Sequence, residues 1–245
     1  MRNIIALFLS VATLTNAQTL SNRVEFDLQT GTYSLMAGNT LAICNASATV
    51  ENLSSTDPGY QRKITGKSNE RFFIECARLD APTLLLEFTL HPSFVELRTG
   101  LKNTTDKPVR IKKMWPLTGG VVFPGENWTD VHTLDAPSGV NPPSVTGSAV
   151  RSSANNLLLT FKQSDTRRSL VLGALKTADF TKWAHVMEGS KAGVEAYDPI
   201  GRLVEPGETY LPADSFYLDA GTANPFEALE QYGQALRQAT GAKPN

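Results

Sequence analysis

The sequence predicts an all-β fold, a large antiparallel β-sandwich (a supersandwich) that ends in one amphipathic helix. Runs with alternating apolar and polar residues recur at a spacing of about 8–15 residues and are separated by turn residues. Helical periodicity is nearly absent before Asn224, where the apolar period changes from two to about 3.6. Alternating strands joined by short turns favour an antiparallel sheet with one solvated face.

The first predicted strands form a hairpin. Val24–Leu28 alternates, a turn follows at Gly31, and Tyr33–Met36 returns. Leu41–Glu51 is a longer strand candidate. The polar stretch 52–69 contains an Asp-Pro-Gly turn signal, and we expect it to be a loop.

The centre of the β pattern precedes a long irregular stretch. Four strand candidates follow one another: Phe72–Leu79, Thr83–Leu90, Phe94–Leu101 and Val109–Trp115. Residues 116–156 are rich in Gly, Pro, Ser and Asn, which predicts an ordered or functional loop. Further strands are expected at Leu157–Phe161, Ser169–Lys176, Trp183–Val186, Gly193–Tyr197 and Tyr210–Asp219.

The C-terminal stretch of the sequence predicts a capped helix. Asn224 suits the N-cap, Pro225 suits the first helical position, and Gly241 suits the C-terminal end. The expected apolar face consists of Phe226, Leu229, Tyr232, Leu236 and Ala239. We expect this helix to be a linker toward a further domain, with its apolar face exposed in the isolated chain.

The first 17 residues are typical of a secretory signal peptide. A short positive start precedes an apolar run, Ile4–Leu14, and a small-residue cleavage site ends at Ala17. This predicts a secreted or periplasmic protein without a transmembrane segment. The expected domains are the signal peptide at 1–17, the sandwich at 18–222, and the helix with its stub at 223–245.

Composition excludes some partners and offers few sites. The net charge of −1 indicates neither nucleic acid nor an anionic membrane as a partner. Cys44 and Cys76, the two cysteines, are either a disulfide or two buried thiols, and export permits a bridge if their strands are neighbours. The three histidines are scattered and no CxxC occurs, so no metal site and no cofactor are predicted.

One short segment could contact a ligand. Trp128, Asp130 and His132 lie at strand spacing, so the carboxylate and the imidazole would share a side. They predict either a sugar-contacting edge or a solvated strand with a tryptophan covering the end of the sandwich. No catalytic residue is predicted, because no phosphate loop, GxSxG elbow or HExxH motif occurs and no spacing selects a serine triad.

Several stretches together resemble a known domain. They are Leu85–Leu90, Phe94–Lys112, Trp115-Pro116-Leu117, Asn155–Thr160, Ser169–Gly173, Tyr197-Asp198-Pro199 and Asn224–Gly233. They are similar to the N-terminal β-supersandwich of melibiase-like α-galactosidases and related glycoside hydrolases. In that family a (β/α)8 barrel follows and carries both catalytic carboxylates, one of them in a Lys-x-Asp motif. No lysine here has an aspartate two positions later.

The resemblance implies a non-catalytic domain of a secreted α-galactosidase-like glycoside hydrolase. It would pack on the barrel, shape one wall of a galactoside pocket through residues 116–135, and take part in a possible homo-oligomer. Trp128 is the residue expected to stack on the sugar. The alternative is a free-standing carbohydrate-binding or interaction module, and an independent enzyme is a third hypothesis that no motif supports.

Overall fold

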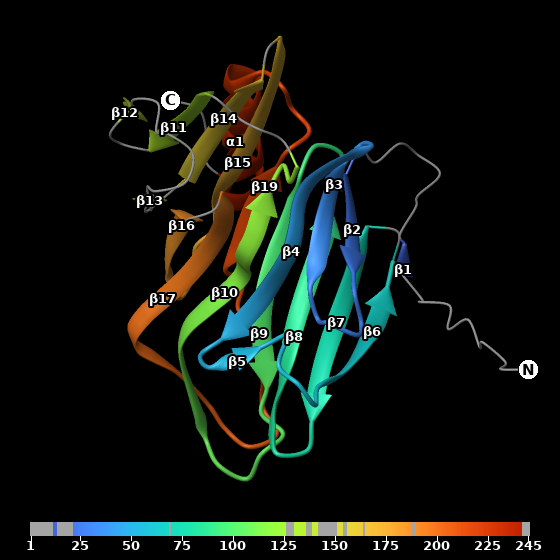
Figure 1. Cartoon of the computed structure of the whole chain (residues 1–245). Coiled ribbons are helices and arrows are strands. Elements are labelled where there is room, and N and C mark those ends of the chain that lie inside the picture. The colour runs from blue at the N-terminus through green and yellow to red at the C-terminus, as the bar shows by residue number, and fades with distance from the viewer. Residues whose placement is uncertain are drawn as a thin grey trace, which may run out of the picture.

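The prediction of an antiparallel β-sandwich is confirmed. The computed structural model describes residues 12–13, 22–68, 70–125, 130–135, 139–141, 151–153, 156–163, 165–187 and 190–241. Within these ranges two antiparallel sheets pack face to face, with β4, β10 and β17 in front of β7, β8 and β9 in Figure 1. We call them sheet A and sheet B.

Sheet A has the strand order β1-β2-β3-β4-β10-β17-β16-β13, with β5 paired to β4. Its strands are β1 (Ala12–Thr13), β2 (Asn22–Phe26), β3 (Tyr33–Ala37), β4 (Thr40–Val50), β5 (Leu53–Ser54), β10 (Val109–Val122), β13 (Arg151–Ser153), β16 (Thr181–Met187) and β17 (Lys191–Val204). The long strands β10 and β17 form its centre.

Sheet B has the order β12-β11-β14-β15-β19-β9-β8-β7-β6, with β18 paired to β9. Its strands are β6 (Gln61–Lys67), β7 (Arg71–Arg78), β8 (Ala81–Leu90), β9 (Val95–Lys102), β11 (Asp130–Asp135), β12 (Gly139–Asn141), β14 (Asn156–Gln163), β15 (Thr166–Lys176), β18 (Thr209–Tyr210) and β19 (Ser215–Asp219). In this sheet the consecutive strands β7, β8 and β9 pair as simple antiparallel hairpins.

The core lies between the two sheets and follows the period-two pattern. Leu84, Leu86 and Phe88 of β8 point inward and are buried. Tyr33 of sheet A packs edge-on against Phe88, with 5.0 Å between ring centroids. Its hydroxyl donates to the carbonyl of Pro116 at 2.6 Å, which satisfies the one polar group that this ring brings inside. Each such buried side chain contributes about 1.5–3 kcal/mol of transfer free energy.

The sequence locates most strands and misses two stretches. The predicted hairpin is β2–β3, and the four central strand candidates are β7, β8, β9 and the first half of β10. The loop expected at 52–69 is wrong, since it holds β5 and β6. The irregular stretch expected at 116–156 is wrong in part: β10 continues to Val122, and β11, β12 and β13 follow.

The predicted helix is α1 (Pro225–Thr240), and its caps are as expected. The side chain of Asn224 accepts a hydrogen bond from the backbone N–H of Phe226 at 3.0 Å. Gly241 adopts a φ of 68° and donates to the carbonyl of Arg237 at 2.9 Å.

The expected exposed apolar face of this helix is wrong. Ala228, Tyr232 and Ala235 are buried against outward-facing side chains of β15 and β19, while Phe226 is 78% exposed. Tyr232 lies over Gly173, where an added Cβ would be 2.5 Å from the ring. The outer face of sheet B thus supplies the partner surface, and the helix is docked on the sandwich.

No helix in the part of the chain that the structure describes is long and apolar enough to cross a membrane.

Candidate functional site

Aromatic and charged side chains gather on the outer face of sheet A. Because β16 and β17 alternate, Trp183 and His185 point away from the core, as do Glu195 and Tyr197. We call this surface the aromatic face; it consists of Lys113, Trp115, Ser152, Trp183, His185, Glu195 and Tyr197. Tyr197 is 41% exposed, and both tryptophans are half-buried.

Strand register assembles this surface from four strands. Trp183 of β16 lies opposite Glu195 of β17, and Tyr197 lies opposite Lys113 of β10. On the outer edge, Ser152 of β13 lies opposite His185. Glu195 thus has Trp183 opposite it on β16, with the imidazole of His185 and the ammonium group of Lys113 on the same surface.

Gly193 makes room for the Trp115 indole. A Cβ at this position would lie 2.9 Å from the Cζ3 atom of Trp115 and 3.1 Å from the terminal carbon of Met187. The indole crosses the glycine and reaches the His185 ring, with 4.8 Å between ring centroids and 32° between planes. A side chain at position 193 would therefore push the indole away.

We expect Gly193→Ala to displace the Trp115 indole and to cost about 1 kcal/mol of unfolding free energy. Tryptophan fluorescence and near-UV circular dichroism should change, and urea unfolding measures the cost. Gly233→Ala on α1 is the control for the tryptophan signal, because a Cβ there meets open space. An unchanged tryptophan signal in Gly193→Ala would show that the indole does not cover this glycine.

A chain of polar contacts fixes the charged groups. Lys113 Nζ lies 2.8 Å from one carboxylate oxygen of Glu195, and His185 Nε2 lies 3.0 Å from the other. The second ring nitrogen of His185, Nδ1, lies 2.8 Å from the hydroxyl oxygen of Ser152. The Glu195 side chain is 11% exposed, so this carboxylate is largely shielded from water.

The imidazole of His185 is the titratable group of interest. Burial lowers the pKa of His185 below its ordinary value, and the positive charge of Lys113 acts in the same direction, whereas Glu195 opposes both. The ring is therefore neutral at pH 7. A neutral imidazole donates from one nitrogen and accepts at the other.

This arrangement has the chemistry of a saccharide surface. Indole faces pack against the apolar C–H face of a sugar ring, and the adjacent donors and acceptors can bind its hydroxyl groups. Lys113, whose side chain is 45% exposed, and the exposed hydroxyl of Ser152 supply such groups on the same surface. A flat sheet face with both kinds of group suits a hydroxylated, uncharged ligand.

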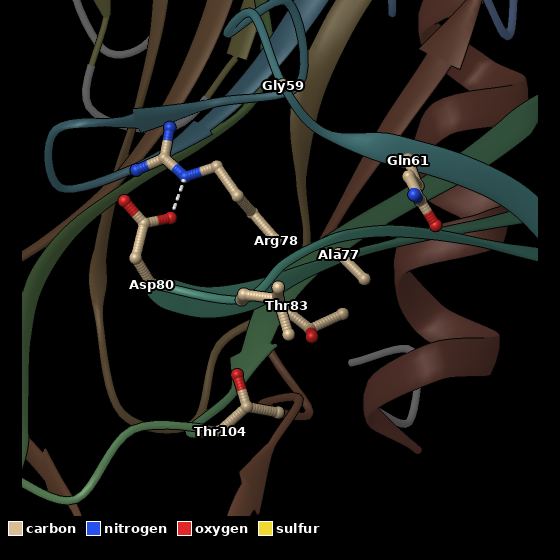
Figure 2. Close-up of a pocket in the computed structure, with 8 residues that line it drawn as sticks. Gly59, Gln61, Ala77, Arg78, Asp80, Thr83 and Thr104 are labelled. Carbon is tan, nitrogen blue, oxygen red and sulfur yellow. Dashed lines mark hydrogen bonds and ion pairs between the residues drawn. The ribbon is translucent and has the colours of Figure 1, made fainter.

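A hollow lies at one end of sheet B. It has a volume of about 720 Å³ and is lined by residues of β6, β7, β8 and the segment after β9 (Figure 2). Its two charged lining residues, Arg78 and Asp80, pair with each other at 2.6 Å, as the dashed line in Figure 2 shows. Leu79 beside them is fully exposed. None of the described residues that line this hollow is aromatic, whereas the aromatic face brings several rings together, so we take the aromatic face as the candidate.

The residues predicted from the sequence are placed only in part. Trp128 lies outside the described residues. Asp130 and His132 belong to β11 of sheet B, where their backbones pair with Lys162 and Thr160 of β14.

The two cysteines are free, so the possible disulfide between Cys44 and Cys76 is not present. Cys44 lies in β4 of sheet A and Cys76 in β7 of sheet B, so their strands are not neighbours. Cys76 is buried and Cys44 is half-buried. Burial raises the pKa of the Cys76 thiol to about 12, which keeps it protonated and unreactive at neutral pH.

No group of three or more His, Cys, Asp or Glu side chains within the described ranges is placed to hold a metal ion.

The aromatic face left a weak signal in the sequence. The two residues in Trp183-x-His185, and those in Glu195-x-Tyr197, are two positions apart, which places both members of each pair on one side of a strand. The pairing of β16 with β17, and of β17 with β10, brings the pairs together across the sheet. Pattern alone does not give that register.

The β-sandwich fold of this chain also occurs in solved structures of enzymes whose names refer to sugars. No model of a known protein family matches the sequence, and no curated protein matches it. The galactose mutarotase related enzyme from Lactobacillus acidophilus matches with a TM-score of 0.56 at 8% identity, over 87% of this chain and 98% of that chain.

Larger enzymes match over part of their length. A glycoside hydrolase family 97 enzyme from Pseudoalteromonas sp. strain K8 has a TM-score of 0.57 at 13% identity, over 86% of this chain and 35% of that one. The α-galactosidase from Lactobacillus brevis has a TM-score of 0.51 at 11% identity, over 92% and 41%. Identities this low show a shared fold alone.

Proposed function

We propose that this protein is a carbohydrate-binding β-sandwich domain whose aromatic face holds a saccharide. The observation that carries the proposal is that Trp183, Glu195 and Trp115 share one face of three neighbouring strands. Trp183 lies opposite Glu195, and the Trp115 indole lies over Gly193 and against the His185 ring. Aromatic rings beside charged and hydroxyl side chains on one surface offer both stacking and hydrogen bonding to one sugar ring. Galactosides are the ligand class we propose, from the resemblance of the sequence.

We further propose that the domain serves a secreted α-galactosidase-like glycoside hydrolase without supplying its catalytic carboxylates. The matches to part of larger glycoside hydrolases support this arrangement, in which a barrel domain packs on the sandwich. The near-complete coverage of a mutarotase-related protein supports the alternative, a free-standing binding module. Export and homo-oligomer formation stay predictions from the sequence.

Trp128, Asp130 and His132 stay a second proposed contact region for the sugar. Asp130 and His132 belong to β11 of sheet B, whereas the aromatic face is on sheet A. Separate variants can therefore distinguish the two regions.

Trp183→Ala is expected to weaken galactoside binding about tenfold, since losing one stacking contact costs about 1.4 kcal/mol. Isothermal titration with methyl α-D-galactoside and with raffinose measures the affinity of the unmodified chain and of the variant. Trp128→Ala tests the other region in the same way.

Phe226→Ala is the matched control, because Phe226 is an exposed aromatic residue on α1, away from sheet A. Its affinity should equal that of the unmodified chain. Binding that Trp128→Ala weakens and Trp183→Ala does not would move the site to the β11 region. Absence of binding to any galactoside, glucoside or mannoside in the unmodified chain would end the proposal of a saccharide surface.

A further inference from the structure

Three side chains at the edge of the aromatic face form a continuous relay. Ser152 of β13 is exposed, and its Oγ lies 2.8 Å from Nδ1 of His185. On the other side of the ring, Nε2 lies 3.0 Å from a carboxylate oxygen of Glu195. Residues of three different strands, β13, β16 and β17, are thus joined by two hydrogen bonds.

The chemistry of these groups fixes where the protons lie. The Glu195 carboxylate, which also pairs with Lys113 at 2.8 Å, can only accept hydrogen bonds. His185 therefore donates from Nε2, which leaves the lone pair of Nδ1 to accept from the Ser152 hydroxyl. A serine hydroxyl that donates to an imidazole oriented by a carboxylate is the arrangement that activates a nucleophile.

The ring is held in place and ready to accept a proton. The Trp115 indole covers His185 with 4.8 Å between ring centroids. Burial, reinforced by Lys113, keeps the pKa of His185 below its ordinary value, so the ring is an unprotonated base at neutral pH. Ser152 by contrast is exposed and accessible to an incoming electrophile.

We propose that Ser152, His185 and Glu195 form a nucleophilic relay in which Ser152 attacks acyl esters. The alcohol portion that we infer, a saccharide resting on the aromatic face, depends on the proposed function; the reactivity of Ser152 does not. Ser152 and His185 are the catalytic residues of this relay, and Glu195 and Lys113 are positioning residues.

The acyl transfer proceeds in two balanced steps. Ser152 Oγ bonds to the carbonyl carbon of the ester while its proton moves to Nδ1 of His185. The carbon–oxygen bond to the sugar then breaks, and the leaving alkoxide takes that proton from His185. Water then attacks the carbonyl carbon of the acyl-serine and passes a proton to Nδ1 of His185. The bond between that carbon and Ser152 Oγ breaks, the carboxylic acid departs, and the proton on Nδ1 returns to Ser152 Oγ.

A fluorophosphonate probe tests the relay, since it phosphonylates an activated serine and contains no sugar. Intact-mass and peptide mass spectrometry should find one adduct on Ser152 of the whole chain, and p-nitrophenyl acetate should be hydrolysed above background. Ser152→Ala should abolish both. His185→Gln should slow both by about 10²–10⁴-fold, the range that a general base contributes.

Ser47→Ala is the matched control: Ser47 lies half-buried in β4 of the same sheet, opposite Thr118, and its loss should change neither rate. Glu195→Gln should lower the rate and move the acid limb of its pH profile to lower pH, because the carboxylate raises the pKa of His185. A merely structural Glu195 would lower the amount of folded protein without moving that limb.

The outcomes separate the relay from the saccharide surface. No adduct on Ser152 of the folded chain, or an adduct that forms equally fast in His185→Gln, overturns the relay whatever the sugar titrations show. Adduct formation without any binding of galactosides supports the relay and overturns the proposed saccharide surface. Thermal melting of each variant establishes that it is folded before its rate is compared.

Discussion

Replacing Lys182 with alanine is expected to lower the free energy of unfolding by about 3–5 kcal/mol. Lys182 is a core-facing residue of β16, and its ammonium group bonds to a carboxylate oxygen of Asp214. Each of these two side chains is 1% exposed. Asp214 also accepts hydrogen bonds from the backbone N–H groups of residues 178, 179 and 180.

The cost arises because the alanine variant leaves the Asp214 carboxylate buried without its counterion. Urea unfolding at pH 7 measures it. Lys191→Ala is the control, because Lys191 is an exposed lysine of the adjacent strand β17 and its loss should cost less than about 0.5 kcal/mol. A loss below about 1 kcal/mol for Lys182→Ala would mean that water reaches Asp214. The pair Lys182→Met with Asp214→Asn should regain part of the lost stability, since it leaves no buried charge.

Glu96→Gln is expected to make the protein less sensitive to acid. Glu96 lies in β9, where His91 Nε2 is 3.3 Å from one carboxylate oxygen and Lys176 Nζ is 3.4 Å from the other. Burial by itself raises the pKa of Glu96, but the His91 hydrogen bond and the Lys176 charge outweigh it and lower the pKa from 4.5 to about 2.

A folded-state pKa below the unfolded value means that the unfolded chain binds protons first as the pH falls. The stabilisation by Glu96 is therefore complete above pH 4.5 and is lost as the pH falls toward 2, and it amounts to about 3 kcal/mol. Urea unfolding at pH 6 and at pH 3 should show a smaller difference for Glu96→Gln than for the unmodified chain. Glu230→Gln, at an exposed position of α1, should retain the difference of the unmodified chain. The same difference in unfolding free energy between pH 6 and pH 3 in all three proteins would contradict the role given to Glu96.

The sequence predicts elements well where hydrophobic alternation is strong. The second half of β8 and the first half of β9 alternate, and both strands are predicted to within two residues of their bounds. β6 was missed because Gln61–Lys67 is polar on both sides, and it lies at the edge of sheet B, where charged residues are common. The helix was located with its caps, but the residues that bury it include the small Ala228 and Ala235, which apolar periodicity weights poorly.

The candidate site was predicted far less well, for a geometrical reason. Ser152, His185 and Glu195 are separated in the chain and meet only when β13, β16 and β17 pair in one register. A shift by one residue would turn His185 into the core, so the site depends on a property that local patterns do not encode. Lys182 misleads in the opposite direction, because a lysine reads as a surface residue and here it is buried.

The two outer faces of the sandwich are occupied differently: α1 covers part of sheet B, and the aromatic face lies on sheet A. A protein tethered to a biosensor chip beyond Gly241 would therefore present the aromatic face to the bulk solution, with Trp183 and Tyr197 accessible. Amine coupling can also modify Lys113, which is 45% exposed beside Glu195, and that modification would remove the ion pair that orients the site. The direction of attachment is thus part of any affinity measurement on this molecule.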